Sequence, residues 1–279
     1  MFVGEEVGLN YAEGPQNGPP LVLLHGVLRC WQDFTPVLAS LASRWHVWAI
    51  DHRGHGKSQH VPNEYLVRDY ARDAEAFIRD VVDEPVVIYG HSLGAMVAAS
   101  VAASLPKLVR GVIMEDPPFT TMGEAITETS FFSLFSGIQE LVGKGLNANG
   151  LARELPEMLI GAPNDSQWRR LGDVRDPVSL RFMAKCLAEI DPTVLRPIVE
   201  ARWQQDFHYE EILSQVRCPA LVLQGDVDAG GMLPDKDAQR IEEIISDCLL
   251  VKVLGCGHLI HWARTETTLQ MIHAFLESL

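Results

Sequence analysis

The segment Gly90-His91-Ser92-Leu93-Gly94 places a serine between two glycines, each two residues away. It follows the apolar run Val86 to Tyr89 and precedes an alanine-rich helical pattern, so the sequence predicts a strand, a tight turn and a helix. A nucleophile in such a turn stands above the sheet in a strained backbone conformation, which requires small residues at the two flanking positions. The helix N-terminus also favours negative charge nearby. We therefore predict that Ser92 is a nucleophile.

A serine hydroxyl is a poor nucleophile at neutral pH, so it needs a base, and the base needs an orienting acid. Two later apolar runs are followed by suitable residues. The first is followed by Gln224-Gly225-Asp226-Val227-Asp228 and the second by Gly255-Cys256-Gly257-His258. Open α/β sheets gather their functional residues at such strand ends. These loops therefore supply candidates for the acid and the base.

The elements that would position these residues are six short apolar runs, most of them without polar alternation. They are Leu21 to Leu24, Val47 to Ile50, Val86 to Tyr89, Gly111 to Met114, Ala220 to Leu223 and Leu249 to Leu254. Helical patterns lie between them, at 31–43, 65–82, 93–105, 235–245 and 266–276. Such alternation is typical of an α/β fold with a mainly parallel sheet covered by helices on both faces.

The alternation stops between residues 117 and 212, which are rich in helical periodicity and poor in β-branched runs. We predict that 117–212 form an inserted helical cap and that 1–116 and 213–279 form the core. The inserted stretch has enough aromatic bulk for some side chains to line a pocket, with Trp168 and Trp203 as candidates. Packing of these side chains onto the core is the alternative role.

With these features the chain resembles the α/β-hydrolase superfamily, in the branch with a cap inserted after the sixth strand. Besides the serine segment, the resemblance rests on His25-Gly26-Val27-Leu28 after the first run and on the segment 51–58, DHRGHGKS, after the second. The order serine, acid, histidine also agrees with this superfamily. The resemblance covers nearly the whole chain and implies an α/β-hydrolase fold.

Carried over to this sequence, the resemblance makes Ser92 the nucleophile, His258 the general base and Asp228 the acid that orients it. In the family pattern the acid lies three residues after the glycine that ends its strand, which is Gly225 here. His261 is a competing base, but the family motif puts the histidine directly after the Gly-x-Gly turn. We expect His261 in the helix that follows or at its start.

Three other carboxylates remain alternatives for the acid, because spacing alone cannot show which one meets the histidine. Asp226 lies in the same loop, whereas Glu115 and Asp116 end an earlier run, where some members of the superfamily place their acid.

The transition state of acyl transfer places charge on the former carbonyl oxygen, which fixed backbone donors must meet. The resemblance points to the N–H groups of Val27 and Leu93. Arg29 lies two residues beyond Val27, within reach of a substrate carboxylate as a forked donor. Exposure is the usual state of an arginine, so a surface position is the simpler expectation for Arg29.

Composition excludes several classes of protein. The 279 residues include 23 basic and 37 acidic side chains, and a net charge of −14 would repel nucleic acids and anionic membranes. No apolar stretch is long enough to span a membrane. The start has no signal-peptide pattern, and the five scattered cysteines include no Cys-x-x-Cys pair. We predict a cytoplasmic protein and leave its oligomeric state open.

We also predict no cofactor and no metal. His52, His55 and His60 lie close together in the sequence, but in a glycine-rich segment without the helical spacing of a metal site.

The sequence therefore predicts hydrolysis of a small carboxylic ester or lactone through an acyl-enzyme on Ser92. An amidase and a hydrolase of carbon–carbon bonds are alternatives that the same residues permit. A lyase or a ligand receptor that retains these residues is a further one.

Overall fold

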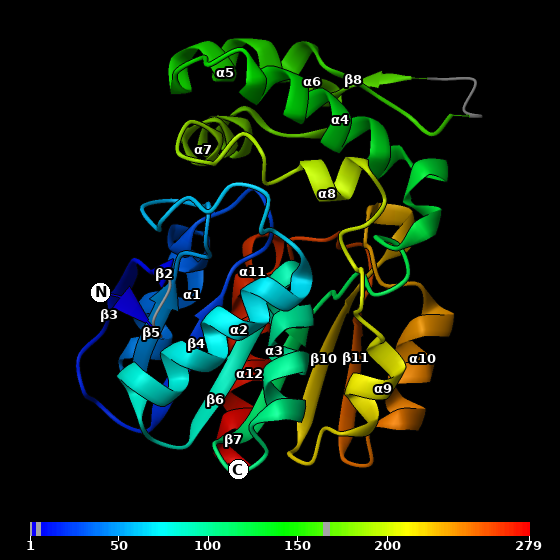
Figure 1. The fold of residues 1–279 in the computed structure, drawn as a ribbon. Helices are drawn as coiled ribbons and strands as arrows, with labels where there is room; N and C mark the ends of the chain where they lie inside the picture. The colour runs from blue at the N-terminus through cyan, green and yellow to red at the C-terminus, as the bar shows by residue number, and fades with distance from the viewer. Residues whose placement is uncertain (1, 4–6, 164–167) are drawn as a thin grey trace.

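The computed structural model of the chain describes residues 2–3, 7–163 and 168–279. In this part of the chain, a seven-stranded sheet forms the centre of the molecule (Figure 1). Its strands, in spatial order, are β11 (Cys248–Val253), β10 (Ala220–Gly225), β7 (Val109–Glu115), β6 (Val86–His91), β4 (Pro20–Leu24), β5 (His46–Ile50) and β3 (Tyr11–Glu13). The edge strand β3 pairs antiparallel with β5, and the other neighbours are parallel. Each of the six predicted runs forms one of these strands.

Alternate residues of the strands point to opposite faces of the sheet. In β4, Leu21 and Leu23 join one apolar core, whereas Val22 and Leu24 join the other. The helices that cover the first face are α1 (Thr35–Ala42), α11 (Ile260–Ala263) and α12 (Thr265–Glu277). The helices that cover the second face are α2 (Val67–Phe77), α3 (Leu93–Ser104), α9 (Tyr209–Ser214) and α10 (Asp235–Ile244). This arrangement confirms the predicted α/β class.

Short turns extend several of these elements. The turn η1 (Trp31–Phe34) leads into α1, and the π-helical turn η2 (Ile78–Val82) continues α2. Near the N-terminus, β1 (Phe2–Val3) pairs antiparallel with β2 (Val7–Gly8). The predicted helical ranges therefore each contain a helix, with its limits changed by a few residues at most ends.

The stretch from 117 to 212 contributes a layer of helices that lies above the carboxyl ends of the strands (Figure 1). Its elements are η3 (Glu124–Glu128), α4 (Ser130–Gly143), α5 (Ala148–Glu154), η4 (Leu155–Glu157), β8 (Leu159–Ile160), β9 (Arg169–Arg170), α6 (Leu171–Val174), α7 (Pro177–Leu187) and α8 (Arg196–Val199). The antiparallel pair β8 and β9 is absent from the predicted elements. The predicted boundary after Ile212 falls inside α9, which packs against α3 and α10 instead of against the upper layer.

Among the helices of the described residues, none is long and apolar enough to cross a membrane. The cytoplasmic location stays a prediction.

Candidate active site

Ser92 lies between the end of β6 and the start of α3, as predicted. Its backbone has φ 55° and ψ −115°, a conformation that L-residues adopt only under strain. The Ser92 N–H donates to the carbonyl of Glu115 at 2.9 Å, and the Ser92 carbonyl accepts from Ala95 and Met96 in the first turn of α3. These bonds hold the turn in place at the N-terminus of the helix. The residue is 4% exposed and lines a pocket.

The two glycines that flank Ser92 are required by close backbone contacts. A Cβ on Gly90 would lie 2.0 Å from the carbonyl oxygen of Gly94, and a Cβ on Gly94 would lie 1.8 Å from that of Leu24. Real side-chain atoms never come so near a carbonyl oxygen. The prediction that both positions need the smallest residue is confirmed.

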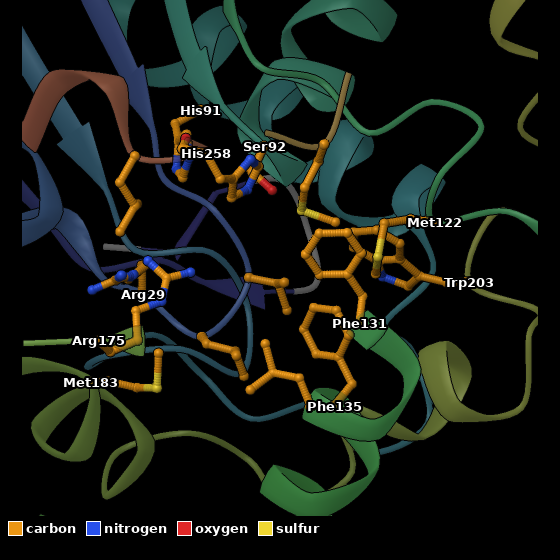
Figure 2. A pocket seen from close by; sticks show the side chains of 15 residues that line it. Arg29, His91, Ser92, Met122, Phe131, Phe135, Arg175, Met183, Trp203 and His258 are labelled. Atoms are coloured by element: carbon orange, nitrogen blue, oxygen red, sulfur yellow. The ribbon is translucent and has the colours of Figure 1, made fainter. Parts of the chain in front are cut away.

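His258 follows β11 and lies beside Ser92 on the wall of the same pocket (Figure 2). Its Nδ1 lies 2.7 Å from Oδ2 of Asp116, the residue that follows β7. Because Asp116 accepts the Nδ1 proton, Nε2 keeps a lone pair that can accept a proton. The ring also packs against His91, with 4.6 Å between the ring centroids, and the His91 Nε2–H donates to the His258 carbonyl at 3.0 Å. The imidazole is therefore held by Asp116 at Nδ1 and by its packing against the His91 ring.

Asp116 is fully buried and accepts three backbone hydrogen bonds besides the one from His258. The donors are the N–H groups of Gly225, Met232 and Leu233, at 2.9, 2.7 and 3.3 Å. Burial raises the pKa of Asp116, but the hydrogen bond and charge of His258 and the backbone donors outweigh burial, so the pKa lies below its ordinary value. Asp116 therefore stays a carboxylate that can stabilise a positive charge on His258.

The prediction that Asp228 meets His258 is wrong. Asp228 is exposed on the short turn η5 (Val227–Ala229), and its own N–H donates to the side chain of Asp226. Asp226 in turn accepts the N–H of Gly255 and so ties its loop to the end of β11. The loop after β10 thus wraps around Asp116 with backbone N–H groups instead of offering a carboxylate. Asp116, one of the alternatives in the sequence, takes the place next to His258.

The neighbouring carboxylate, Glu115, pairs with the other candidate histidine. Its Oε1 lies 2.8 Å from Nδ1 of His261 and also accepts the N–H groups of Ile260 and His261, at 2.8 and 3.0 Å. Nε2 of His261 lies 3.2 Å from the carbonyl oxygen of Asp33, so both ring nitrogens face acceptors. His261 lies in α11, as expected.

The charges of this second pair favour an imidazolium between carboxylates. Burial lowers the pKa of His261, but Glu115 and Asp33 raise it more, to about 10. Burial raises the pKa of Glu115, but the charge of His261 and its hydrogen bond bring it down to about 2. His261 is fully buried and outside the pocket lining, so it has no access to Ser92 or a substrate.

Val27 and Leu93 are the two residues whose backbone N–H groups are predicted to bind the oxyanion. Val27 follows β4 and lines the pocket, in a turn where Leu28 has φ 69° and the Arg29 N–H donates to Gly26. Leu93 is the first residue of α3. Within residues 2–3, 7–163 and 168–279, neither backbone N–H has an acceptor. Both donors are therefore free for a ligand.

The pocket lies between the sheet and the helical layer (Figure 2). Two of the three predicted substrate contacts, Arg29 and Trp203, line it. Arg29 is 6% exposed, so the expectation of a surface arginine is wrong: Asp33, 3.7 Å away, and the ring of Phe182 bury it. Trp203 is 1% exposed, and its indole Nε1–H has no hydrogen-bond partner in the described part of the chain.

Trp168 does not contribute to this pocket, which contradicts the prediction. It is 47% exposed and lies against Gly161 next to the β8 and β9 pair. Phe131 and Phe135, which belong to the aromatic bulk of the inserted stretch, also line the pocket. Sequence reasoning missed Met122, Arg175 and Met232, which no motif marks.

The histidines of the 51–58 segment serve the structure of the loop. His52 and His55 are buried against His25, with 4.6 and 5.3 Å between ring centroids. Burial and the neighbouring rings lower the pKa of His52, and burial above all lowers that of His55, to about 3. His60 lies outside this cluster, near Asp191. Among the described residues, no group of His, Cys, Asp or Glu has the arrangement of a metal site.

A parallel sheet with a strained serine turn after a central strand is the architecture of the α/β hydrolases. The model of the Alpha/beta hydrolase family matches residues 21–270, so the chain belongs to this family. The predicted fold is thereby confirmed. The prediction of a hydrolase is confirmed as well, since the family is one of hydrolases and the similar proteins include a diacylglycerol lipase and an enol-lactonase.

Three similar proteins illustrate the family. A 2-(acetamidomethylene)succinate hydrolase of Mesorhizobium japonicum is 36% identical over 100 residues, a match that covers 36% of each chain. The crystal structure of an E-2-(acetamidomethylene)succinate hydrolase has a TM-score of 0.75 at 22% identity and covers 97% of this chain and 96% of its own. The enol-lactonase of Burkholderia xenovorans LB400 has a TM-score of 0.72 at 18% identity and covers 99% of this chain and 98% of its own. At these identities, the two structures establish the fold alone.

Proposed function

We propose that the protein hydrolyses a small carboxylic ester or lactone through an acyl-enzyme on Ser92. The observation that supports this most is the 2.7 Å contact between His258 and the buried carboxylate of Asp116, beside a serine on a strained turn. A base oriented by an acid is what activates a serine hydroxyl. The similarity to an enol-lactonase agrees with this choice of substrate.

In the first step the Ser92 oxygen attacks the substrate carbonyl while Nε2 of His258 takes the serine proton. The negative oxygen of the tetrahedral intermediate accepts hydrogen bonds from the N–H groups of Val27 and Leu93, and Asp116 stabilises the imidazolium. His258 then gives its proton to the leaving alcohol as the carbon–oxygen bond breaks. The products of this step are the free alcohol and the acyl-enzyme.

In the second step water attacks the acyl-enzyme and His258 takes one proton from that water. The second tetrahedral intermediate collapses with cleavage of the bond to Ser92, which receives the proton back. The carboxylic acid leaves and the enzyme returns to its starting state. Each step uses only residues of this chain.

An amide is the second candidate for the bond that is cleaved. The relative at 36% identity is named for a substrate with an acetamido group. The same residues can attack an amide carbonyl, and His258 would then protonate an amine.

The test is the release of p-nitrophenol from short-chain p-nitrophenyl esters by the wild type, Ser92→Ala and the control Ser214→Ala. Ser214 is exposed, and its hydroxyl contacts only the carbonyl of Glu211 among the described residues. We expect Ser92→Ala to lose nearly all turnover and Ser214→Ala to keep it. An organophosphorus probe should label Ser92 in the wild type.

Turnover that survives in Ser92→Ala would contradict the proposal. An inactive wild type that resists the probe would do the same and favour a lyase or a receptor. If the wild type is active, a screen of esters, lactones and amides would rank its substrates. Ring-cleavage diketones would test for hydrolysis of carbon–carbon bonds.

A further inference from the structure

The pocket beside Ser92 has two chemically different walls. Met122, Phe131, Phe135 and Trp203 form an apolar wall, and the guanidinium groups of Arg29 and Arg175 form a cationic wall on the other side (Figure 2). Arg29 belongs to the loop after β4, and Arg175 follows α6 in the helical layer. Ser92 and His258 lie between the two walls. A substrate whose reacting carbonyl lies at Ser92 can therefore extend along both walls.

The charges of the cationic wall are only half compensated. Arg29 has a buried partner, Asp33, at 3.7 Å. Arg175 has no carboxylate within ion-pair distance in the described part of the chain. The carboxylate of the adjacent Asp176 instead accepts the N–H groups of Val178 and Ser179 and the hydroxyl of Ser179 at the start of α7.

Other titratable groups at the pocket do not supply the missing negative charge. Burial, then the charges of neighbouring histidines, bring the pKa of His91 down to about 3, so this ring is neutral. The carboxylate of Asp116 is engaged by His258 and three backbone N–H groups. Burial lowers the pKa of Arg175 and the charge of Arg29 lowers it further, and the opposing charge of Asp176 does not offset these two effects. An arginine nevertheless stays charged in a protein.

Arg175 is half-buried, so part of its guanidinium is removed from water without an ion-pair partner, and a ligand that provides the counter-charge would offset this cost. The two arginines of the pocket contrast with the chain as a whole, which has a net charge of −14 and therefore a surface field that does not favour anions. Two arginines side by side match the two oxygens of a carboxylate, each of which accepts N–H donors in the plane of the group.

We propose that Arg29 and Arg175 form a carboxylate-binding subsite, so that the substrate is an anionic ester or amide with a carboxylate on one side of the cleaved bond and an apolar group on the other. This inference rests on the proposed function for the cleavage itself, but not for the binding of the carboxylate. Arg29 is the fixed half of the subsite, because Asp33 and Phe182 hold it in place. Arg175 supplies the charge that the ligand neutralises.

The test compares pairs of esters of similar shape, one member of each pair being anionic and the other neutral. One pair has the carboxylate on the acyl side: mono-p-nitrophenyl adipate and its methyl ester. The other has it on the leaving group: p-acetoxybenzoate and p-acetoxyacetophenone. The enzymes are the wild type, Arg175→Gln, Arg175→Lys and the control Arg181→Gln, which removes an exposed arginine from α7 outside this pocket.

We expect the wild type to prefer the anionic member of at least one pair by tenfold or more in kcat/KM. A charge-assisted hydrogen-bond pair is worth about 10- to 100-fold in affinity. Arg175→Gln should lose this preference, because its kcat/KM falls at least tenfold more for the anionic ester than for the neutral one. Arg175→Lys should keep part of the preference, and Arg181→Gln should behave as the wild type.

Equal kcat/KM for both members of each pair in the wild type, or an unchanged preference in Arg175→Gln, would overturn the subsite while leaving ester hydrolysis intact. Calorimetry with adipate and p-hydroxybenzoate on Ser92→Ala and on Ser92→Ala/Arg175→Gln gives a readout without turnover. Binding that weakens at least tenfold without Arg175 supports the subsite even if no ester is cleaved. The absence of binding to either protein refutes it.

Discussion

The exchange of Asp116 for asparagine tests whether Asp116, which contacts His258 in the structure, or Asp228, which the family spacing indicates, orients this histidine. The carboxylate accepts four N–H groups: Oδ2 accepts from His258 and Met232, and Oδ1 accepts from Gly225 and Leu233. Asparagine has one acceptor oxygen and one NH₂ group, so it cannot satisfy all four donors.

Both orientations of the amide are unfavourable. With NH₂ at the Oδ2 position, the amide group faces the Met232 N–H, which loses its acceptor, and donates to Nδ1 of His258. The ring proton of His258 then lies on Nε2, and this nitrogen cannot accept the proton of Ser92. With NH₂ at the Oδ1 position, His258 keeps its bond, but two backbone N–H groups lose theirs and the stabilising charge is gone. The unpaired donors should lower the free energy of unfolding by about 1–3 kcal/mol.

We expect Asp116→Asn to lower kcat for p-nitrophenyl acetate by about 10² to 10⁴, the upper value being the effect of the same exchange in a chymotrypsin-type triad. At about 1.36 kcal/mol per factor of ten, this is roughly 3–5 kcal/mol of transition-state stabilisation. Asp228→Asn is the matched control. Its side chain is exposed, so activity should stay within about twofold and the free energy of unfolding within about 0.5 kcal/mol.

The assay is steady-state kinetics on both variants, with urea unfolding to confirm that each is folded. A hundredfold loss in Asp228→Asn together with near-normal activity in Asp116→Asn would refute the geometric reasoning. A similar loss in both would show that the loop after β10 acts on His258 through a route other than its backbone bonds to Asp116.

Two further predictions concern the donor loop and the buried histidine. Val27→Pro removes the proposed oxyanion N–H and should lower kcat about 10²- to 10³-fold. Val27→Ala keeps that N–H and should keep most of the activity. Equal activity of the two variants on p-nitrophenyl acetate would exclude the Val27 N–H as an oxyanion donor. The pKa of His261 is raised from 6.5 to about 10, so its pairing with Glu115 stabilises the fold fully below about pH 6.5 and loses this effect as pH rises toward 10. In urea unfolding at pH 6, 8 and 9.5, the wild type should lose stability by up to about 1.4 kcal/mol per pH unit from this group, and His261→Gln should show a smaller slope. Parallel curves for the two proteins would contradict the assignment of charge to His261.

The strands and the serine turn were predictable because their signals are local. A short apolar run without polar alternation is typical of a strand that is buried on both faces. The need for glycine on both sides of Ser92 arises from close contacts around the turn between β6 and α3. His258 was predictable for the same reason, since it directly follows the turn that ends β11. The limits of the elements differ by only a few residues.

The histidine's partner could not be found in this way, because it depends on which strand ends meet in space. Asp116 and Asp228 both follow strands of the sheet, and β7 and β10 are neighbours. What decides between them is the path of the loop after β10, which turns Asp228 outward and directs the N–H groups of Met232 and Leu233 to Asp116. No local pattern in the sequence encodes that path.

The burial of Arg29 was missed for a related reason. An arginine is usually exposed, and only its neighbours in the fold, Asp33 four residues on and Phe182 from the helical layer, show that this one is enclosed. Arg175 lies in the same layer without any motif around it. The pocket therefore combines residues that the sequence marks clearly with others that only the packing of the layer reveals.

The consecutive residues Glu115 and Asp116 give two nearby histidines opposite roles. Glu115 is the last residue of β7 and points into the buried core, where it fixes the start of α11 and pairs its negative charge with the positive charge of His261. Asp116 has φ 46°, so its side chain leaves the strand direction and meets His258 at the pocket. His261 has acceptors at both ring nitrogens and therefore holds its proton. Among the described residues, the ring of His258 has an acceptor at Nδ1 only, so its Nε2 can take up and release a proton. The charged pair beneath the site thus anchors the turn that carries His258, and the pair at the pocket leaves that residue free to act as a base.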